Sequence, residues 1–184
     1  MPPYFIEPQH PKANVAPDRT AINRVMILGF VAQRKVNGHR VQIHVSSDGE
    51  FAAFTRQGKP HTAQIPQNIK EHLIAMARPK SGWTCLDGEW QKQESKIYLF
   101  DILRLEDELL SSLTFFERFE KLLGIFRIGP GVSILPIIKD VDGVMELMGD
   151  GNKFTEGVVL RNPKEIGWQN TAILRCRKTI FFNE

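Results

Sequence analysis

The stretch RVQIHVSSDGEFAAFT, residues 40–55, decides the fold class. Apolar and polar residues alternate over residues 40–45, which gives a strand with one apolar and one polar face. The pair Asp48-Gly49 is typical of a tight hairpin turn, and residues 51–55 have the composition of the returning strand. Strands joined by so short a turn run antiparallel. The sequence therefore predicts an antiparallel sheet at the centre of the domain.

Other segments extend this pattern in both directions. The apolar run at residues 24–31 predicts a buried strand upstream of the hairpin. Downstream strands are expected over residues 83–89, 97–103, 132–138, 156–161 and 171–177.

Three helices separate these strands. Pro66 is placed to open a helix that Pro79 stops, and residues 140–148 form a short helix ended by Gly149. Thr114 and Glu117 have the spacing of a capping box, which predicts the start of a third helix. The aromatic residues that follow recur at helical spacing, and this spacing favours packing in the core over a platform for base stacking. The fold class is therefore α+β, with mixed, largely antiparallel sheets and packed helices.

Length and composition limit the classes of protein to which the chain can belong. A chain of 184 residues and 21.0 kDa fits one domain, with residues 1–20 as a proline-rich extended arm on the surface and residues 21–184 as the folded domain. The net charge of +3 permits an anionic partner without requiring one. No apolar run is long enough to span a membrane and no signal peptide is recognisable, so we expect an intracellular protein, cytoplasmic if it is bacterial or from a phage.

The cysteines and histidines do not have the spacing of a known metal-binding motif. Cys85 and Cys176 lie far apart and belong to no paired motif, so free buried thiols are expected. The five histidines have no ligand spacing.

Lys35 stands at the end of an apolar strand, before a turn that contains Gly38. A neutral amine is a good nucleophile, and partial burial together with nearby cations, here Arg34 and Arg40, favours the neutral form of a lysine. The alternative is an ordinary solvated basic turn.

Five further motifs follow Lys35 in order: Thr55-Arg56-Gln57-Gly58, Asp87-Gly88-Glu89, Phe100-Asp101, Glu156-Gly157 with an apolar run to Arg161, and Arg175-Cys176-Arg177. This ordered series resembles that of the covalent nucleotidyltransferase superfamily, which comprises polynucleotide ligases and messenger RNA capping enzymes. The resemblance covers residues 24–178. The stretch from Gly38 to His44 looks most like ATP-dependent DNA ligases, and Glu156 also favours ligases, because capping enzymes usually carry Asp there.

The resemblance implies a fold, a reaction and a set of roles. The fold is the nucleotidyltransferase, or ATP-grasp-like, adenylation domain, without the oligonucleotide-binding domain that usually follows. Lys35 would attack the α-phosphate of ATP and form a lysyl-adenylate, which then passes to a 5′-phosphate. For the nucleotide, the resemblance implies that Gln33 recognises the adenine amino group, Phe100 stacks on adenine, and Arg40 and Glu89 contact the ribose. It also implies that Glu156 binds Mg²⁺ and that Arg175 and Arg177 bind the phosphates. Arg56 would bind the 5′-phosphate of the nick.

The implied partner is nicked duplex nucleic acid, DNA rather than RNA, and the implied processes are DNA repair and replication. A separate clamp domain or a partner chain could hold the duplex. Asn37 replaces the Asp of the family signature. Two alternatives therefore stay open: an RNA ligase or capping-type guanylyltransferase, and a catalytically impaired module that binds nucleotide or nucleic acid.

Overall fold

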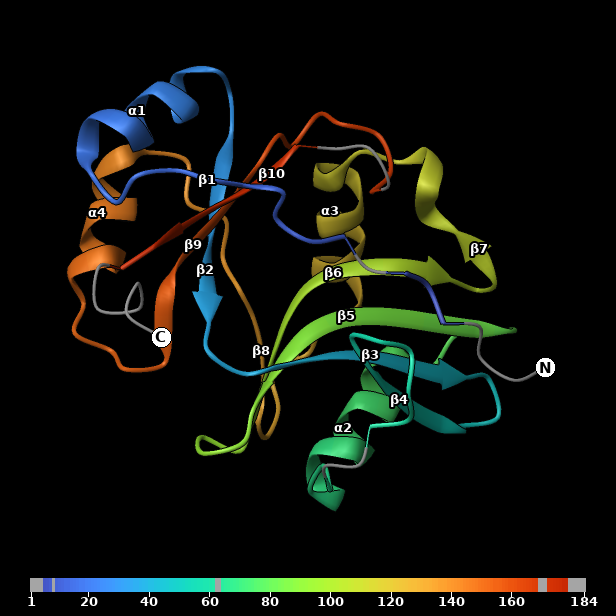
Figure 1. Cartoon of the computed structure of the whole chain (residues 1–184). Coiled ribbons are helices and arrows are strands. Elements are labelled where there is room, and N and C mark those ends of the chain that lie inside the picture. The colour runs from blue at the N-terminus through green and yellow to red at the C-terminus, as the bar shows by residue number, and fades with distance from the viewer. Residues whose placement is uncertain (1–4, 8, 62–63, 169–171, 179–184) are drawn as a thin grey trace.

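The computed structural model describes residues 5–7, 9–61, 64–168 and 172–178, and these residues form two sheets that lie side by side (Figure 1). The four-stranded sheet has the order β1 (Ala13–Asn14), β10 (Ile173–Arg177), β9 (Thr155–Arg161) and β2 (Val31–Val36). The six-stranded sheet has the order β4 (Phe51–Thr55), β3 (His39–Ser46), β5 (Trp83–Gln91), β6 (Lys96–Leu105) and β7 (Glu108–Leu109), and β8 (Val132–Ile134) pairs with β6. Most of the pairs are antiparallel, while β1–β10 and β6–β8 are parallel. The predicted α+β class is confirmed.

Helices cover one face of each sheet. Helices α1 (Arg19–Ile27) and α4 (Val141–Gly149) pack on the four-stranded sheet, where Ile22 and Val144 meet Ala32, Val158 and Leu160 in one apolar cluster. Helix α2 (Gln67–Ala77) packs on the six-stranded sheet, and α3 (Phe115–Ile125), after a short 3₁₀ turn (Leu110–Ser112), packs against β6. Each sheet therefore has its own core.

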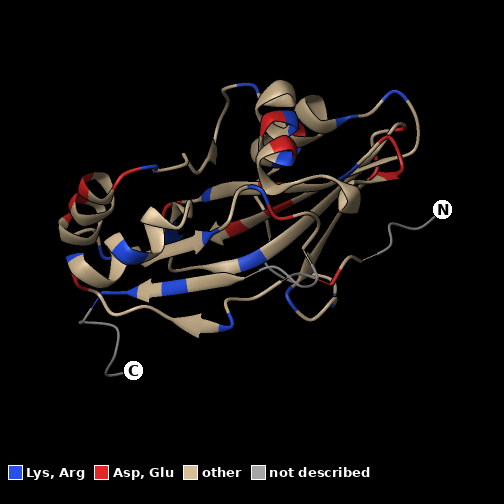
Figure 2. Ribbon diagram, turned by 90° about the horizontal axis from the view of Figure 1, so that it is seen from above, with Lys and Arg blue, Asp and Glu red and all other residues tan. Residues whose placement is uncertain are grey.

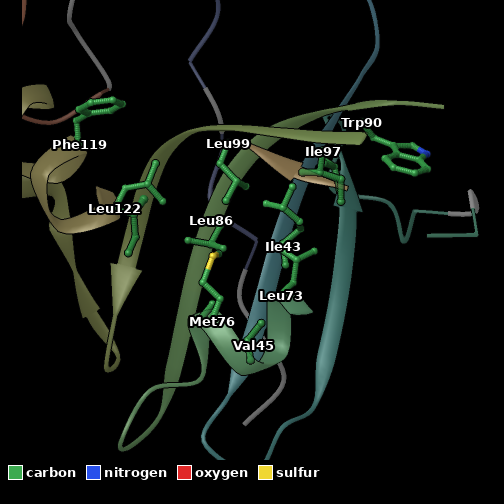
Figure 3. Packing of buried hydrophobic residues seen from close by; sticks show 14 of the residues in the cluster. Ile43, Val45, Leu73, Met76, Leu86, Trp90, Ile97, Leu99, Phe119 and Leu122 are labelled. Atoms are coloured by element: carbon green, nitrogen blue, oxygen red, sulfur yellow. The ribbon is translucent and has the colours of Figure 1, made fainter. Parts of the chain in front are cut away.

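The larger core lies between α2, α3 and the six-stranded sheet. Ile43, Leu86 and Leu99 project from adjacent strands towards Leu73 of α2, and all four side chains are fully buried (Figure 3). Because side chains alternate along a strand, this packing turns the polar residues of β3 and β5 towards the opposite face. The functional cleft lies on that second face.

Several local predictions are confirmed. The hairpin joins β3 to β4 with Gly49 at φ +84°, a conformation that favours glycine. Pro66 is the N-cap of α2, and the capping box of Thr114 and Glu117 begins α3. Both cysteines are free and buried.

The strand predicted over residues 24–31 is wrong, because its first part is helical. Asp18 caps α1 by accepting a hydrogen bond from the amide of Ala21, and Ile22, Val25 and Met26 then recur at helical spacing on the sheet-facing side. An apolar run of this length does not by itself distinguish a buried strand from a helix.

The strand predicted over residues 132–138 ends after Ile134. Leu135 still bonds to Leu99 of β6, but Ile138 bridges to Ala32 of β2, so this segment crosses from one sheet to the other. The aromatic stripe on α3 is buried at Phe115, Phe119 and Leu122, whereas Phe116 is 37% and Leu123 50% exposed. None of the helices in the described ranges has the length and apolar character needed to span a bilayer.

Candidate functional site

A cleft of about 590 Å³ opens between the two sheets. All nine residues predicted from the sequence line it: Gln33, Lys35, Arg40, Arg56, Glu89, Phe100, Glu156, Arg175 and Arg177. They come from β2, β9 and β10 on one side and from β3, β5, β6 and the turn after β4 on the other. Figure 2 shows basic positions on several of the strands, with acidic positions among them. The fold thus gathers residues that are up to 144 positions apart, from Gln33 to Arg177.

The register of the four-stranded sheet aligns its cleft-lining side chains in rows. Lys35 pairs with Gly157, which pairs on its other side with Arg177. One row away, Gln33 and Arg175 flank Val159 in the same manner. Because residues two apart on a strand share a face, the lysine and both arginines project into the same cleft.

Glu156 links the lysine to the arginine. Its Oε2 accepts a short hydrogen bond from Nζ of Lys35 and lies 3.5 Å from Nε of Arg177. The side chains of Lys35 and Glu156 are 21% and 16% exposed, so the pair is only partly screened by solvent. Here the structure differs from the expectation that neighbouring arginines surround the amine. Arg34 lies near Glu94 and over the ring of Tyr98 instead.

The six-stranded sheet contributes a second charged pair. Arg40 is bound by Asp87, with Nε 3.0 Å from Oδ1, and its guanidinium carbon lies 5.2 Å from the centre of the Phe100 ring. Burial alone would lower the pKa of Arg40, but the combined attraction of Asp87, Glu89 and Asp101 raises the pKa above its ordinary value. Asp87 stood in the Asp-Gly-Glu motif but was not among the predicted site residues.

Glu89 lies directly opposite Arg40 in the ladder between β3 and β5. Burial raises its pKa to about 7, against the opposing attraction of Arg40 and Lys35. A carboxyl group that titrates near neutrality is typical of functional sites.

Gln33 is the buried polar group of the cleft, with 2% exposure. Its Nε2 donates to the carbonyl of Leu135 at 3.0 Å, which fixes the amide orientation, and its Oε1 has no hydrogen-bond partner among the residues that the structure describes. A buried acceptor without a partner costs free energy, so this oxygen is suited to a donor brought by a ligand.

The N-terminal segment, expected as an extended arm on the surface, also forms part of the cleft wall. Ile6 is buried, and its backbone exchanges two hydrogen bonds with the side-chain amide of Gln42, at 2.9 and 2.7 Å. Residues 9–11 line the cleft, and the segment then joins the other sheet as β1 (Figure 1). Sequence reasoning missed this because its contacts are made with residues distant in sequence, and no local pattern signals them.

A buried ion network lies beside Phe100. Asp101 accepts two hydrogen bonds from Arg118, at 2.9 and 3.0 Å, and its Oδ2 lies 3.5 Å from Arg161. Burial lowers the pKa of Arg161 to about 10 despite the attraction of Asp101. Arg118 also donates to the carbonyls of Leu113 and Gly167. This network anchors the middle of β6, next to Phe100.

Two carboxylates, Glu89 and Glu156, line the cleft. In the described part of the chain, no group of three or more His, Cys, Asp or Glu side chains could hold a metal ion.

Comparisons with known proteins find similarity to ligases. Residues 12–91 match the family described as the ATP dependent DNA ligase domain. DNA ligase 1 of Saccharomyces cerevisiae is 28% identical over a region that covers 55% of this chain and 17% of the yeast protein. The chain thus spans only about a sixth of that relative.

Solved ligase structures share the fold. A mycobacterial DNA ligase D complexed with ATP superimposes with a TM-score of 0.57 at 17% identity, covering 80% of this chain and 54% of that one. The ATP-dependent DNA ligase of bacteriophage T7, in complex with ATP, gives 0.52 at 16% identity, covering 90% and 69%. An archaeal ATP-dependent RNA ligase gives 0.53 at 17% identity, covering 92% and 48%.

The two sheets, with the cleft between them, have the fold of the nucleotide-binding region of these ligases. The chain is therefore similar in sequence to ATP-dependent DNA ligases over part of its length, and it shares their fold.

Proposed function

We propose that this chain is the adenylation domain of an ATP-dependent polynucleotide ligase that seals nicks in duplex DNA through a lysyl-adenylate on Lys35. The observation that carries the proposal is the convergence of all nine predicted residues on one cleft, with Lys35 and Arg177 in register across Gly157. A solvated basic turn would not bring these residues together.

The nucleotide base fits the partners that the cleft offers. The Oε1 atom of Gln33 is a buried acceptor without a partner, so it suits the exocyclic amine of adenine, whereas guanine presents a carbonyl oxygen at that position. Phe100 offers a ring for stacking, and Arg40 and Glu89 offer a donor and an acceptor for the ribose hydroxyls. These features favour ATP over GTP.

The phosphates of the nucleotide fit the wall of the cleft that β2, β9 and β10 form. Nζ of Lys35 attacks the α-phosphorus, a phosphorus–nitrogen bond forms and the bond to pyrophosphate breaks. The amine must first lose a proton, and Oε2 of Glu156 is its hydrogen-bonded acceptor. Arg175 and Arg177 stabilise the charge that develops on the phosphate oxygens, with bidentate guanidinium groups where lysines are usual.

The donor set of the cleft also fits Mg²⁺. This ion is usually held by one or two carboxylates together with substrate phosphates, so Glu156 and the nucleotide would suffice. When bound, Mg²⁺ would supply Lewis-acid stabilisation of the phosphate charge.

The turn after β4 is placed to bind the nucleic-acid strand that receives AMP. Arg56 is exposed at the mouth of the cleft and would bind the 5′-phosphate of a nick. Nicked duplex DNA is the proposed partner, held with the help of a separate clamp domain or a partner chain, in DNA repair or replication inside the cell.

Incubation with α-labelled ATP or GTP, followed by addition of nicked DNA or RNA duplexes, tests the proposal. We expect covalent label from ATP and its transfer to nicked DNA. Label from GTP would instead indicate a capping-type guanylyltransferase, and transfer to RNA alone would indicate an RNA ligase. Nucleotide binding without covalent label would indicate an impaired binding module, which the Asn37 substitution in the family signature would explain.

A further inference from the structure

The N-terminal segment accepts hydrogen bonds from arginines of the cleft. Its three acceptors are the carbonyl of Gln9 for Arg40 at 2.7 Å, Nε2 of His10 for Arg56 at 3.1 Å, and Oδ1 of Asn14 for Arg175 at 2.6 Å. Each of these arginines is assigned a role under the proposed function. The segment therefore contacts the part of the site that binds anions.

We propose that His10 is a positioning residue for Arg56, holding its guanidinium in the orientation that binds the 5′-phosphate of the acceptor strand. This inference rests on the proposed function and adds to it a residue outside the family's motif series.

Arg56 lies on an exposed turn and depends on His10 for its orientation. In the ranges that the structure describes, His10 is its hydrogen-bond partner, and no carboxylate forms an ion pair with it. The bond uses Nε, so the two terminal nitrogens can still donate in a bidentate manner to a phosphate. Without His10, this long side chain would sample many rotamers.

His10 is itself held from both sides. Upstream, Ile6 is bound by Gln42; downstream, β1 pairs with β10. In addition, the ring of Phe5 packs against Gly58, so closely that a Cβ there would lie 2.9 Å from it. Gly58 belongs to the same turn as Arg56, so the segment and the turn are packed together.

A neutral imidazole positions Arg56 without neutralising it. Burial lowers the pKa of His10, and so do the charges of Arg40 and Arg56, while Asp87 and Glu7 oppose the shift. The unprotonated ring can accept the hydrogen bond. A carboxylate at this place would instead cancel the charge that attracts the phosphate, as Asp87 does for Arg40.

The test uses the 184-residue chain and separates two reactions: self-adenylation with ATP, and single-turnover transfer of AMP from the adenylated chain to a nicked duplex with a 5′-phosphate. The variants are His10→Ala, His10→Gln, Arg56→Ala and the double variant His10→Ala/Arg56→Ala. His72→Ala is the matched control, because His72 lies on α2, on the opposite face of the six-stranded sheet.

We expect His10→Ala to slow transfer about five-fold, the effect of one hydrogen bond, while self-adenylation and the urea midpoint stay unchanged. His10→Gln should restore transfer to within about two-fold, because its amide oxygen can accept the same bond. The double variant should be no slower than Arg56→Ala alone. The ratio of the wild-type transfer rate to that of His10→Gln should decrease as the pH is lowered, because the imidazole gains a proton and can no longer accept the hydrogen bond.

Equal losses in both reactions, or additive losses in the double variant, would overturn the inference. A wild-type advantage over His10→Gln that grows in acid would also overturn it, because His10 would then bind the phosphate directly as a cation. A wild-type chain that gains no adenylate defeats the proposed function itself, and the inference fails with it.

Discussion

Lys35 and Arg177 lie on the two strands that flank β9, and both are opposite Gly157. Gly157 itself has no side chain to separate them, and Glu156, the preceding residue of β9, contacts both. Gly157 has a φ of +146° and lies so close to β10 that a Cβ would be 2.0 Å from the carbonyl oxygen of Cys176. The glycine therefore sets the spacing of the sheet at the point where nucleophile and phosphate-binding arginine face the cleft.

Replacing Gly157 with alanine should disturb both the sheet and the reaction. We expect Gly157→Ala to lower the free energy of unfolding by about 3 kcal/mol and to abolish adenylate formation, because backbone atoms of β10 must move. Urea denaturation and labelling with ATP measure the two effects. Gly124→Ala is the control, since Gly124 lies on α3 with no atom within 4 Å of an added Cβ, and it should change stability by at most about 1 kcal/mol. Equal effects of the two substitutions would contradict this account.

Phe100→Ala should weaken ATP binding by about 1 to 3 kcal/mol, the usual cost of losing an aromatic partner of a base. Calorimetric titration with a non-hydrolysable ATP analogue gives the affinity. Phe116→Ala serves as the control, because Phe116 is partly exposed on α3 and does not line the cleft. If both variants bind the analogue like the wild type, Phe100 is a packing residue.

Glu89 should make stability depend on pH. The unfolded carboxyl releases its proton near 4.5, whereas the folded one retains it to about 7. Between these values the folded state binds more protons, so raising the pH destabilises the wild type. The stability of Glu89→Gln minus that of the wild type should therefore grow by up to about 3 kcal/mol between pH 4.5 and 8. Parallel pH curves from urea denaturation would show that Glu89 is not shifted.

Arg118→Met should lower the free energy of unfolding by about 3 to 5 kcal/mol, because it leaves the buried Asp101 without its bidentate partner. The double variant Arg118→Met/Asp101→Leu should recover part of the loss, since no buried charge is then left unpaired by Arg118. The double variant also removes the ion pair between Asp101 and Arg161. If it is less stable than Arg118→Met, the loss of that ion pair costs more free energy than the removal of the unpaired carboxylate recovers. Thermal and urea denaturation give these values.

Much of the six-stranded sheet and the membership of the site could be predicted from local patterns. The alternation before Asp48-Gly49, the proline before α2 and the capping box at Thr114 are chemical signals contained within a few residues. The site residues were recognisable because each stands in a short motif and the motifs keep their order.

The sequence could not predict relationships between distant segments. The apolar run near Met26 fitted a strand as well as a helix, and only packing on the four-stranded sheet decides between them. The pairing of Ile6 with Gln42, and that of His10 with Arg56, join residues 36 and 46 positions apart. The contact of Glu156 with Lys35 likewise depends on the register of β2 and β9.

Intact-mass measurement after incubation with ATP and Mg²⁺ tests the central claim most directly. The account predicts that the wild type gains the mass of one AMP, that the adduct maps to the peptide containing Lys35, and that Lys35→Ala gains none while keeping the wild-type urea midpoint. An adduct of unchanged yield in Lys35→Ala, or a wild type that gains no mass, would contradict it.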